Sequence, residues 1–314
     1  EISACLVGSE MCIRDRLFTG NRMVVWWLLL VYVMFGAAWL ISRRRKARYW
    51  IPAACSVLAL CAVLTVNAVQ LQRTSTVTAL DVSQGQSIVF SSGRACAVVD
   101  CGGRSTVEDP GDLAARKLLA QGHRSLDLLV FTHPHDDHIN GVLRLMHWLP
   151  VRTLVIPAAA DTTKAPLSDI LALAVENHTT VVRVDAERTV TAGSISVHLY
   201  PEPCAGQEDG SMIVLTSIGD YDTLVPGDVD SVAEVKFLSD CAYPSVELLL
   251  VGHHGSKKST SDAWLDAIAP DDAIISVGYN NYGHPTSDTL ERLQAHHIPI
   301  YRTDQMGDIT VHLS

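Results

Sequence analysis

Thr132-His133-Pro134-His135-Asp136-Asp137-His138 follows directly on Leu126–Phe131, an apolar segment that predicts a buried strand. Three histidines and two aspartates thus fall within six positions. Such a density of ionisable groups is costly to desolvate unless a cation neutralises it, and imidazole and carboxylate are common ligands of divalent metals. In an extended turn His133 and His135 point to the same side, and Asp137 and His138 can fold back to face them. The stretch therefore predicts two adjacent metal-ligand sets.

Short strands and amphipathic helices alternate on both sides of this stretch, from about residue 74 to the end of the chain. The other strands expected are Val77–Val82, Ser87–Phe90, Ala95–Val99, Thr153–Ile156, Ser194–Tyr200, Met212–Ile218, Thr223–Val225, Val246–Val251, Ala273–Val277, Ile300–Thr303 and Ile309–Leu313. The helices expected are Gly141–Leu149, Leu167–Asn177, Ser261–Ile268 and Thr286–His296. This order predicts a layered α/β domain over residues 73–314, with two sheets between layers of helices.

Two apolar segments precede this domain, Met23–Leu40 and Ile51–Val69, and each runs for about 18 residues without a charge. They predict two transmembrane helices within residues 23–72, in agreement with a hydrophobic content of 48% and a mean hydropathy of +0.19. The basic connector Arg43–Arg48 predicts a loop on the cytoplasmic side of the inner membrane. Two crossings would then place everything after Val69 outside the cytoplasm.

Glu1–Arg16 shows neither the order of a signal peptide nor a helical or strand period. The run Cys5–Asp15 resembles a translated sequencing adapter. We therefore expect residues 1–22 to be a non-native or disordered leader, and we expect the natural amino terminus further upstream. The two helices would then be the end of a larger membrane protein.

Charge is distributed unevenly along the chain. Residues 74–314 hold 15 Lys or Arg against 31 Asp or Glu, which gives a formal charge of −16. A domain this acidic is not a general nucleic-acid-binding surface, because it repels phosphate. An anionic substrate would need metal ions or a local basic cluster to bind.

Several motifs point to one known family. The pattern His-x-His-x-Asp-His at His133–His138 resembles the signature of the metallo-β-lactamase superfamily. The further motifs are Leu80–Ser87, Val99–Gly103, Pro226–Asp228, Val251–Ser256 and Tyr282–Pro285. Together they resemble the ComEC-type competence proteins, membrane channels of DNA uptake, over about residues 23–314. The resemblance implies an αβ/βα sandwich, one or two zinc or manganese ions, DNA at the cell surface as partner, and an upstream channel portion.

The resemblance also implies roles for single residues. It assigns His133 and His135 to a first metal, Asp137 and His138 to a second metal, Asp228 to the position between them, and His254 to the completion of the second site. His253 and His254 leave the same strand end, so either could be the ligand, and the other would lie in the substrate pocket. Asp137 could alternatively orient the attacking water. His284 is expected to contact a phosphate or a leaving group.

Two features depart from the superfamily pattern. No histidine occupies the position of the usual third ligand of the first metal, and Glu208–Ser211 stands there instead. Gln86 replaces a carboxylate, which removes one metal or water contact. Substrate binding is expected at Ser211, at Ser256 and at the adjacent cations Lys257 and Lys258.

These observations leave three hypotheses. The first is a metal-dependent phosphodiesterase or nuclease of a DNA-uptake protein, with water activated by metal ions. The second is a degenerate domain that guides DNA without cleaving it. The third is a surface metallohydrolase of small esters or lactams.

Overall fold

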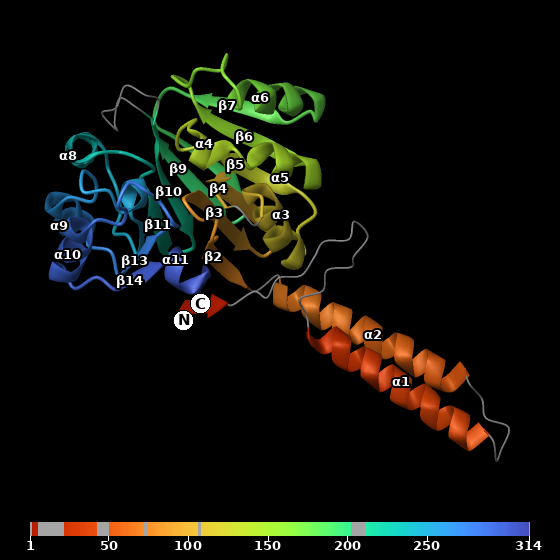
Figure 1. Cartoon of the computed structure of the whole chain (residues 1–314). Coiled ribbons are helices and arrows are strands. Elements are labelled where there is room, and N and C mark those ends of the chain that lie inside the picture. The colour runs from red at the N-terminus through yellow and green to blue at the C-terminus, as the bar shows by residue number, and fades with distance from the viewer. Residues whose placement is uncertain are drawn as a thin grey trace.

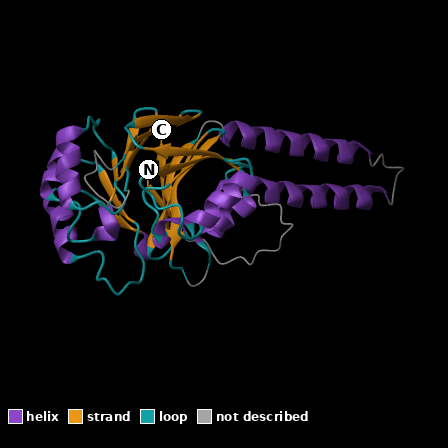
Figure 2. Cartoon of the chain, turned by 90° about the horizontal axis from the view of Figure 1, so that it is seen from above, coloured by secondary structure: helices purple, strands orange, loops and turns teal. Residues whose placement is uncertain are grey.

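The computed structural model describes residues 2–5, 22–42, 50–71, 74–105, 108–201 and 211–313. Most residues from 74 onward form a layered domain, and helices α1 (Arg22–Ser42) and α2 (Trp50–Leu71) lie side by side and project away from it (Figure 1). Two sheets lie face to face at the centre of the domain, and helices lie outside them (Figure 2).

The first sheet has eight strands in the order β1-β15-β2-β3-β4-β5-β6-β7. It is antiparallel from β1 to β4 and parallel from β4 to β7. Its strands are β1 Ile2–Cys5, β2 Ser75–Ala79, β3 Gly85–Ser92, β4 Ala95–Gly103, β5 Leu126–Val130, β6 Val151–Pro157, β7 Thr180–Val184 and β15 Asp308–Leu313.

The second sheet has seven strands in the order β14-β13-β12-β11-β10-β9-β8. It is antiparallel from β8 to β11 and parallel from β11 to β14. Its strands are β8 Arg188–Ala192, β9 Ile195–Tyr200, β10 Ile213–Ile218, β11 Tyr221–Val225, β12 Leu248–Leu250, β13 Asp272–Ile275 and β14 Ile300–Arg302.

Helices cover the outer face of each sheet. Against the first sheet lie α3 Pro110–Ala120, α5 Val142–Trp148 and α6 Leu167–Glu176, whose apolar faces join one buried cluster with β4 to β6. Against the second sheet lie α8 Ser231–Asp240, α9 Asp262–Ile268 and α10 Ser287–Ala295. The short elements are α4 Asp136–Ile139, the 3₁₀ turn η1 Gly252–Gly255 and α11 Thr303–Met306. The expected αβ/βα sandwich is therefore confirmed.

The central strands are apolar on both faces because both faces are covered. In β5, Leu128 and Val130 belong to the cluster between the two sheets, whereas Leu129, and Phe131 directly after the strand, belong to the cluster under the helices. Successive side chains of a strand point to opposite faces, so a strand between two covered faces is apolar at successive positions, as Leu128–Phe131 are. This is why Leu126–Phe131 was recognisable in the sequence.

Every strand expected inside the domain overlaps an observed strand. Among the described residues, the longer elements missed were α3, β7, β8 and α8, and the short elements α4, η1 and α11 were not predicted either. The strands β7 and β8 are the edge strands of their sheets, and most of their side chains are exposed or half-buried, so their apolar signal is weak. Both missed helices carry start signals that are visible in the sequence, since Asp109 caps α3 and Asp230 caps α8.

The two amino-terminal helices are α1 Arg22–Ser42 and α2 Trp50–Leu71, and the Trp27 indole N–H donates to the Ser56 carbonyl at 3.0 Å between them. Many of their large apolar side chains are exposed, for example Trp26 and Leu58. The sequence predicted that both helices cross a membrane. Within the described ranges, however, no helix combines the length and the apolarity that a membrane crossing requires. The basic connector lies outside the described residues.

Part of the expected leader lies within the described residues. Ile2–Cys5 form β1, which pairs antiparallel with β15, while residues 6–21 lie outside the described residues, so the leader assignment stays a prediction. Without this pairing β15 would be an edge strand with unpaired backbone groups, which a short extended segment can satisfy. Tertiary pairing of this kind leaves no local pattern in the sequence.

Gly102 permits the contact on which the metal-ligand turn depends. A Cβ at this position would meet backbone atoms of Asp137 and His138 at 2.5 Å, so α4 can lie on β4 only because residue 102 has no side chain. We predict that Gly102→Ala lowers the free energy of unfolding by about 3 kcal/mol through overpacking. Thermal unfolding of the purified chain measures this.

The matched control is Gly219→Ala, because Gly219 has φ +64° and no heavy atom within 4 Å of its built Cβ. It should lose only about 1 kcal/mol through backbone strain. Equal melting temperatures for the two variants would contradict the proposed contact.

Candidate metal centre

The predicted metal-ligand turn lies at the carboxyl end of β5. Phe131 and His133 are fully buried, His135 has the extended backbone of an N-cap, and Asp137 and His138 lie in the single turn of α4. The chain therefore reverses direction between His135 and Asp137, so the two halves of the motif face each other.

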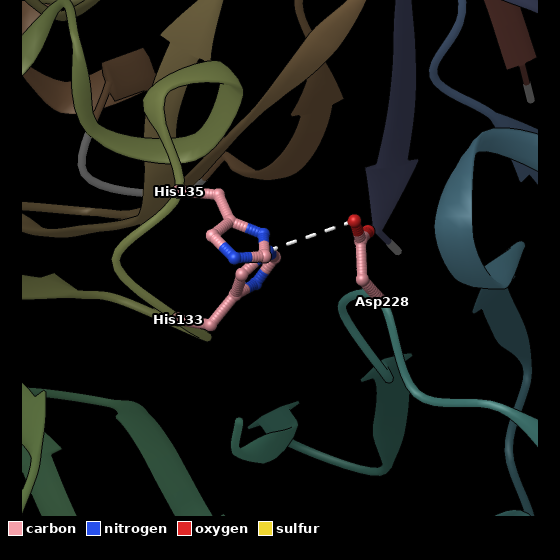
Figure 3. Close-up of side chains that lie close together, drawn as sticks. All are labelled: His133, His135 and Asp228. Carbon is pink, nitrogen blue, oxygen red and sulfur yellow. Dashed lines mark ion pairs between the residues drawn. The ribbon is translucent and has the colours of Figure 1, made fainter. Parts of the chain in front are cut away.

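Two groups of side chains in this region could each hold a metal ion. The first group is His133, His135 and Asp228, which Figure 3 shows converging from two segments of the chain. The second group is Asp137, His138 and His254. Within each group the ligand atoms all lie within 4.8 Å of one another.

Asp228 lies between the two groups. Its Oδ2 is 3.6 Å from His133 Nε2, and its Oδ1 is 3.3 Å from His138 Nε2 and 3.9 Å from His254 Nε2. Oδ2 is also 3.7 Å from His253 Nε2. Both carboxylate oxygens thus face imidazole nitrogens at distances longer than direct hydrogen bonds.

Parallel strands bring the distant residues to the same place. Asp228 follows the end of β11 and His254 follows the end of β12, and these strands are parallel neighbours. Residues after neighbouring parallel strands meet at one edge of the sheet, where α/β proteins usually place their sites. Gly227 makes the turn with φ +62°, and His253 and His254 adopt the left-handed region with φ 51° and 53°.

A carboxylate behind the site orients one ligand. The Asp100 Oδ2 accepts from His138 Nδ1 at 2.7 Å. Asp100 is itself held by the backbone N–H and hydroxyl of Thr132, each at 2.7 Å, and by the Gln86 amide at 2.8 Å. A histidine held in this way presents its other nitrogen to a metal.

The other two buried rings are held similarly. His254 Nδ1 donates to the Ser276 carbonyl at 2.8 Å, and His133 Nδ1 lies 3.1 Å from the Thr132 hydroxyl. The Nε2 atoms of His133, His138 and His254 all point inward, and these buried atoms and Asp228 Oδ1 have no hydrogen-bond partner within the described structure. Buried polar atoms are rarely left unpaired. Their convergence fits two divalent metal ions with nitrogen and oxygen ligands.

The pKa shifts of the site residues agree with this assignment. Burial lowers the pKa of His133 to about 3, with a further contribution from the neighbouring charge of His138. Burial alone would lower the pKa of His138 too, but the carboxylates of Asp228 and Asp100 raise it well above its usual value. Burial alone would raise the pKa of Asp228, but the charge of His138 holds it well below its usual range. The carboxylate is therefore an anion, as a metal ligand must be.

Members of both groups line an open cleft of about 510 Å³, while His133 and His138 are buried behind it. Its lining contains the predicted residues Asp137, His253 and His284 together with residues of the two metal groups. The structure places His254, and not His253, in a ligand group, while His253 is 40% exposed at the cleft. The ring of His284 is 5.6 Å from that of His253, and its pKa is lowered by burial and by the nearby histidines.

Four residues expected to bind substrate are not found in the lining of the cleft, within the described part of the chain: Ser211, Ser256, Lys257 and Lys258. Ser211 and Ser256 are buried, and the two lysines are exposed on a turn beyond η1. The left-handed residues of η1 redirect the chain, and this turn packs against Arg292 instead, whose guanidinium contacts the carbonyls of residues 257 and 259.

Sequence reasoning missed or misread other residues of the site. Arg104, Tyr282 and Gln84 line the cleft without having been predicted to do so. Gln86 was expected to cost a metal or water contact, whereas its amide donates to Asp100 and so supports His138. Gln84, Asp100 and Tyr282 lie within motifs that were quoted for the family resemblance, and Arg104 directly follows one of them, which is the sequence signal that could have found them.

Residues 80–279 match the model of the metallo-beta-lactamase superfamily, and the chain belongs to this superfamily. Its domain is homologous to the corresponding part of ComEC-type competence proteins. It is 29% identical over 249 residues to ComE operon protein 3 of Bacillus subtilis (strain 168), covering 73% of this chain and 32% of that protein. It is 30% identical over 243 residues to competence protein ComA of Neisseria gonorrhoeae, covering 74% and 31%.

The chain thus spans about a third of the length of these relatives. Among solved structures, the metallo-beta-lactamase fold protein YhfI from Bacillus subtilis superposes with a TM-score of 0.53 and 12% identity, over 76% of this chain and 100% of that one. This similarity supports the fold alone.

The placement of the two adjacent histidines gives a first prediction for the site. His254→Ala should remove most of the metal bound by the second group, because the remaining carboxylate and imidazole would hold an incomplete site. His253→Ala should retain most of its metal, because His253 lies outside both groups. Elemental analysis of the two purified variants after dialysis measures their metal content. A larger loss of metal in His253→Ala than in His254→Ala would make His253 the ligand.

The raised pKa of His138 gives a second prediction. The metal-free imidazole carries a proton at neutral pH, which a metal must displace, so the metal affinity should rise with pH by up to about tenfold per pH unit. The gain should end once the pH exceeds the pKa of His138 in the metal-free protein. Titration calorimetry in two buffers of different ionisation enthalpy measures the proton released, and a buffer-independent heat would contradict the prediction.

Proposed function

We propose that this domain is a divalent-metal-dependent phosphodiesterase that cleaves DNA as part of a DNA-uptake protein. The observation that carries the proposal is the pair of ligand groups that share Asp228 at the base of an open cleft. The homology with competence proteins supports DNA as the substrate.

Bound divalent ions would lower the pKa of a coordinated water and neutralise charge on a phosphate. The protein supplies the geometry. Asp228 faces both ligand groups and would fix the spacing between the ions. His138, His254 and His133 each make a hydrogen bond through Nδ1, which orients Nε2 toward the site. Metal binding would therefore require little rearrangement of these rings.

Other cleft residues would contact the phosphodiester. Arg104 lies at the rim and provides a cation in a domain whose formal charge is −16. It takes the role that the sequence assigned to Lys257 and Lys258. The attraction is local, since the surface as a whole repels a polyanion.

His284 is a candidate to contact the leaving oxygen or a phosphate oxygen. Its lowered pKa keeps the imidazole neutral at neutral pH, so the ring offers one N–H donor and one acceptor. Its Nδ1 is buried without a hydrogen-bond partner among the described residues. Asp137 and His253 complete the polar surface around it.

One feature favours a second candidate function, a domain that guides DNA without cleaving it. The first metal group has no third histidine and consists of His133, His135 and Asp228, of which His135 is exposed. An ion with three protein ligands binds more weakly than one in a closed site. The intact second group and the shared carboxylate favour catalysis over guidance.

The location of the domain is also a proposal. We infer that it works at the outer face of the cytoplasmic membrane, beside the channel portion of a longer protein. The basic connector Arg43–Arg48 and the exposed apolar side chains of α1 and α2 support this location, because such a surface needs an apolar partner.

Asp228→Asn provides the test of catalysis. The amide keeps the volume of the side chain but loses the charge between the groups, so hydrolysis of DNA should fall by at least about 100-fold. The assay follows cleavage of single- and double-stranded oligonucleotides by the purified chain with added Mn²⁺ or Zn²⁺. Circular dichroism verifies that the variant is folded.

Asp220→Asn, on the exposed turn between β10 and β11, is the matched control and should cleave like the unmodified chain. Oligonucleotide binding without cleavage under any metal condition would favour the guiding role. Turnover of small esters or lactams, but not of DNA, would favour a surface metallohydrolase.

A further inference from the structure

The loop between β13 and α10 carries two exposed aromatic side chains, one of which lines the metal cleft. Tyr282 is 59% exposed and lines the cleft, and Tyr279, three residues earlier on the same loop, is 90% exposed. Large aromatic rings usually bury most of their surface, so an exposed tyrosine in the lining of a cleft indicates a contact surface. The metal chemistry described above uses neither ring.

This loop has a fixed shape. The Asn280 side chain donates to the carbonyls of Gly278 at 2.9 Å and His284 at 2.8 Å, and it accepts from the N–H groups of Tyr282 at 3.1 Å and His284 at 3.0 Å. At one end, Gly278 packs against Ser83 so closely that a Cβ would lie 2.4 Å from it. The backbone that carries Tyr282 is therefore held in place before any ligand binds, which lowers the entropy lost on binding.

A cation lies against the inner ring. The Arg104 guanidinium donates to the Tyr282 hydroxyl at 3.1 Å, and its central carbon is 6.0 Å from the ring centroid. Arg104 follows β4 and lines the same cleft. An arginine can pair with the phosphate of a nucleotide while an adjacent aromatic ring stacks on its base.

The rings form a row that leads to the metal groups. The centroid of Tyr282 is 5.9 Å from that of His284, and His284 is 5.6 Å from His253. His253 in turn lies 3.7 Å from Asp228. A strand with one phosphate at the metal groups would therefore place a neighbouring nucleotide at Tyr282.

We propose that Tyr282, with Arg104 beside it and Tyr279 on the outer part of the loop, is a subsite that stacks one unpaired nucleobase next to the phosphate being cleaved. In a duplex both faces of a base are covered by its neighbours, so the subsite selects a single strand or a frayed end. Stacking tolerates every base, because each has a π face, and so implies little sequence preference. The inference rests on the proposed function, since it assumes that a phosphodiester enters the cleft.

The test compares equilibrium binding of two labelled oligomers of equal length to the full chain by fluorescence anisotropy, with Ca²⁺ in place of a catalytic metal. One is single-stranded DNA, and the other has the same sugar–phosphate backbone without bases. The chain should bind the DNA about tenfold more tightly than the baseless oligomer, from stacking of one base. Tyr282→Ala should abolish this ratio, and Tyr282→Phe should keep it because the ring remains.

Arg104→Ala should weaken the binding of both oligomers by a similar factor and reduce the dependence on salt, since it contacts the backbone. The matched controls are Tyr32→Ala, an exposed tyrosine of α1, and Arg188→Ala, an exposed arginine of β8. Neither should change the ratio between the oligomers.

Equal binding of the two oligomers by the unmodified chain, or an unchanged ratio in Tyr282→Ala, would overturn the subsite. A different measurement, cleavage of DNA, decides the proposed function. Base-dependent binding without cleavage under Mn²⁺ or Zn²⁺ would support the subsite and contradict catalysis. Cleavage without base-dependent binding would support catalysis and contradict the subsite.

Discussion

The carboxylate of Asp228 lies among imidazoles that come from both halves of the sandwich, and the rest of the site depends on this arrangement. His133 and His138 follow a strand of the first sheet, while Asp228 and His254 follow strands of the second. Separation of the sheets would leave four charged or polar groups without their partners. The apolar cluster between the sheets therefore keeps the metal ligands together, and the ligand charges need a cation to offset their burial.

Asp100 shows how the first sheet prepares its part of the site. It has φ 58°, a strained conformation for a residue other than glycine, and it is fully buried. Thr132, Gln86 and His138 all donate to its carboxylate, so the strain and the buried charge are offset by hydrogen bonds. A carboxylate in place of Gln86 would face Asp100 at hydrogen-bond distance and repel it. The neutral amide thus suits an orienting role behind the metal ligand.

Charge limits how this domain could bind a polyanion. The domain as a whole is strongly acidic, and the cleft itself is lined by Asp136, Asp137 and Asp228 as well as by Arg104. A polyanion would therefore need bound metal ions, in addition to Arg104, to offset these carboxylates. The proposed stacking subsite on loop 278–285 would add contacts that do not depend on charge. Binding would then depend on both the metal ions and a nucleobase.

The sequence by itself determined the central strands and the ligand turn, because a buried strand is a continuous apolar run and because six consecutive positions carry all the ligand types at His133–His138. It also indicated that Asp228 and the pair His253 and His254 follow the ends of strands. Tertiary structure alone decided which of that pair joins a ligand group, since the left-handed turn of η1 sets the direction of each side chain. It also removed Lys257 and Lys258 from the cleft and brought in Arg104 and Tyr282, because the approach of two distant loops leaves no periodic pattern in the chain.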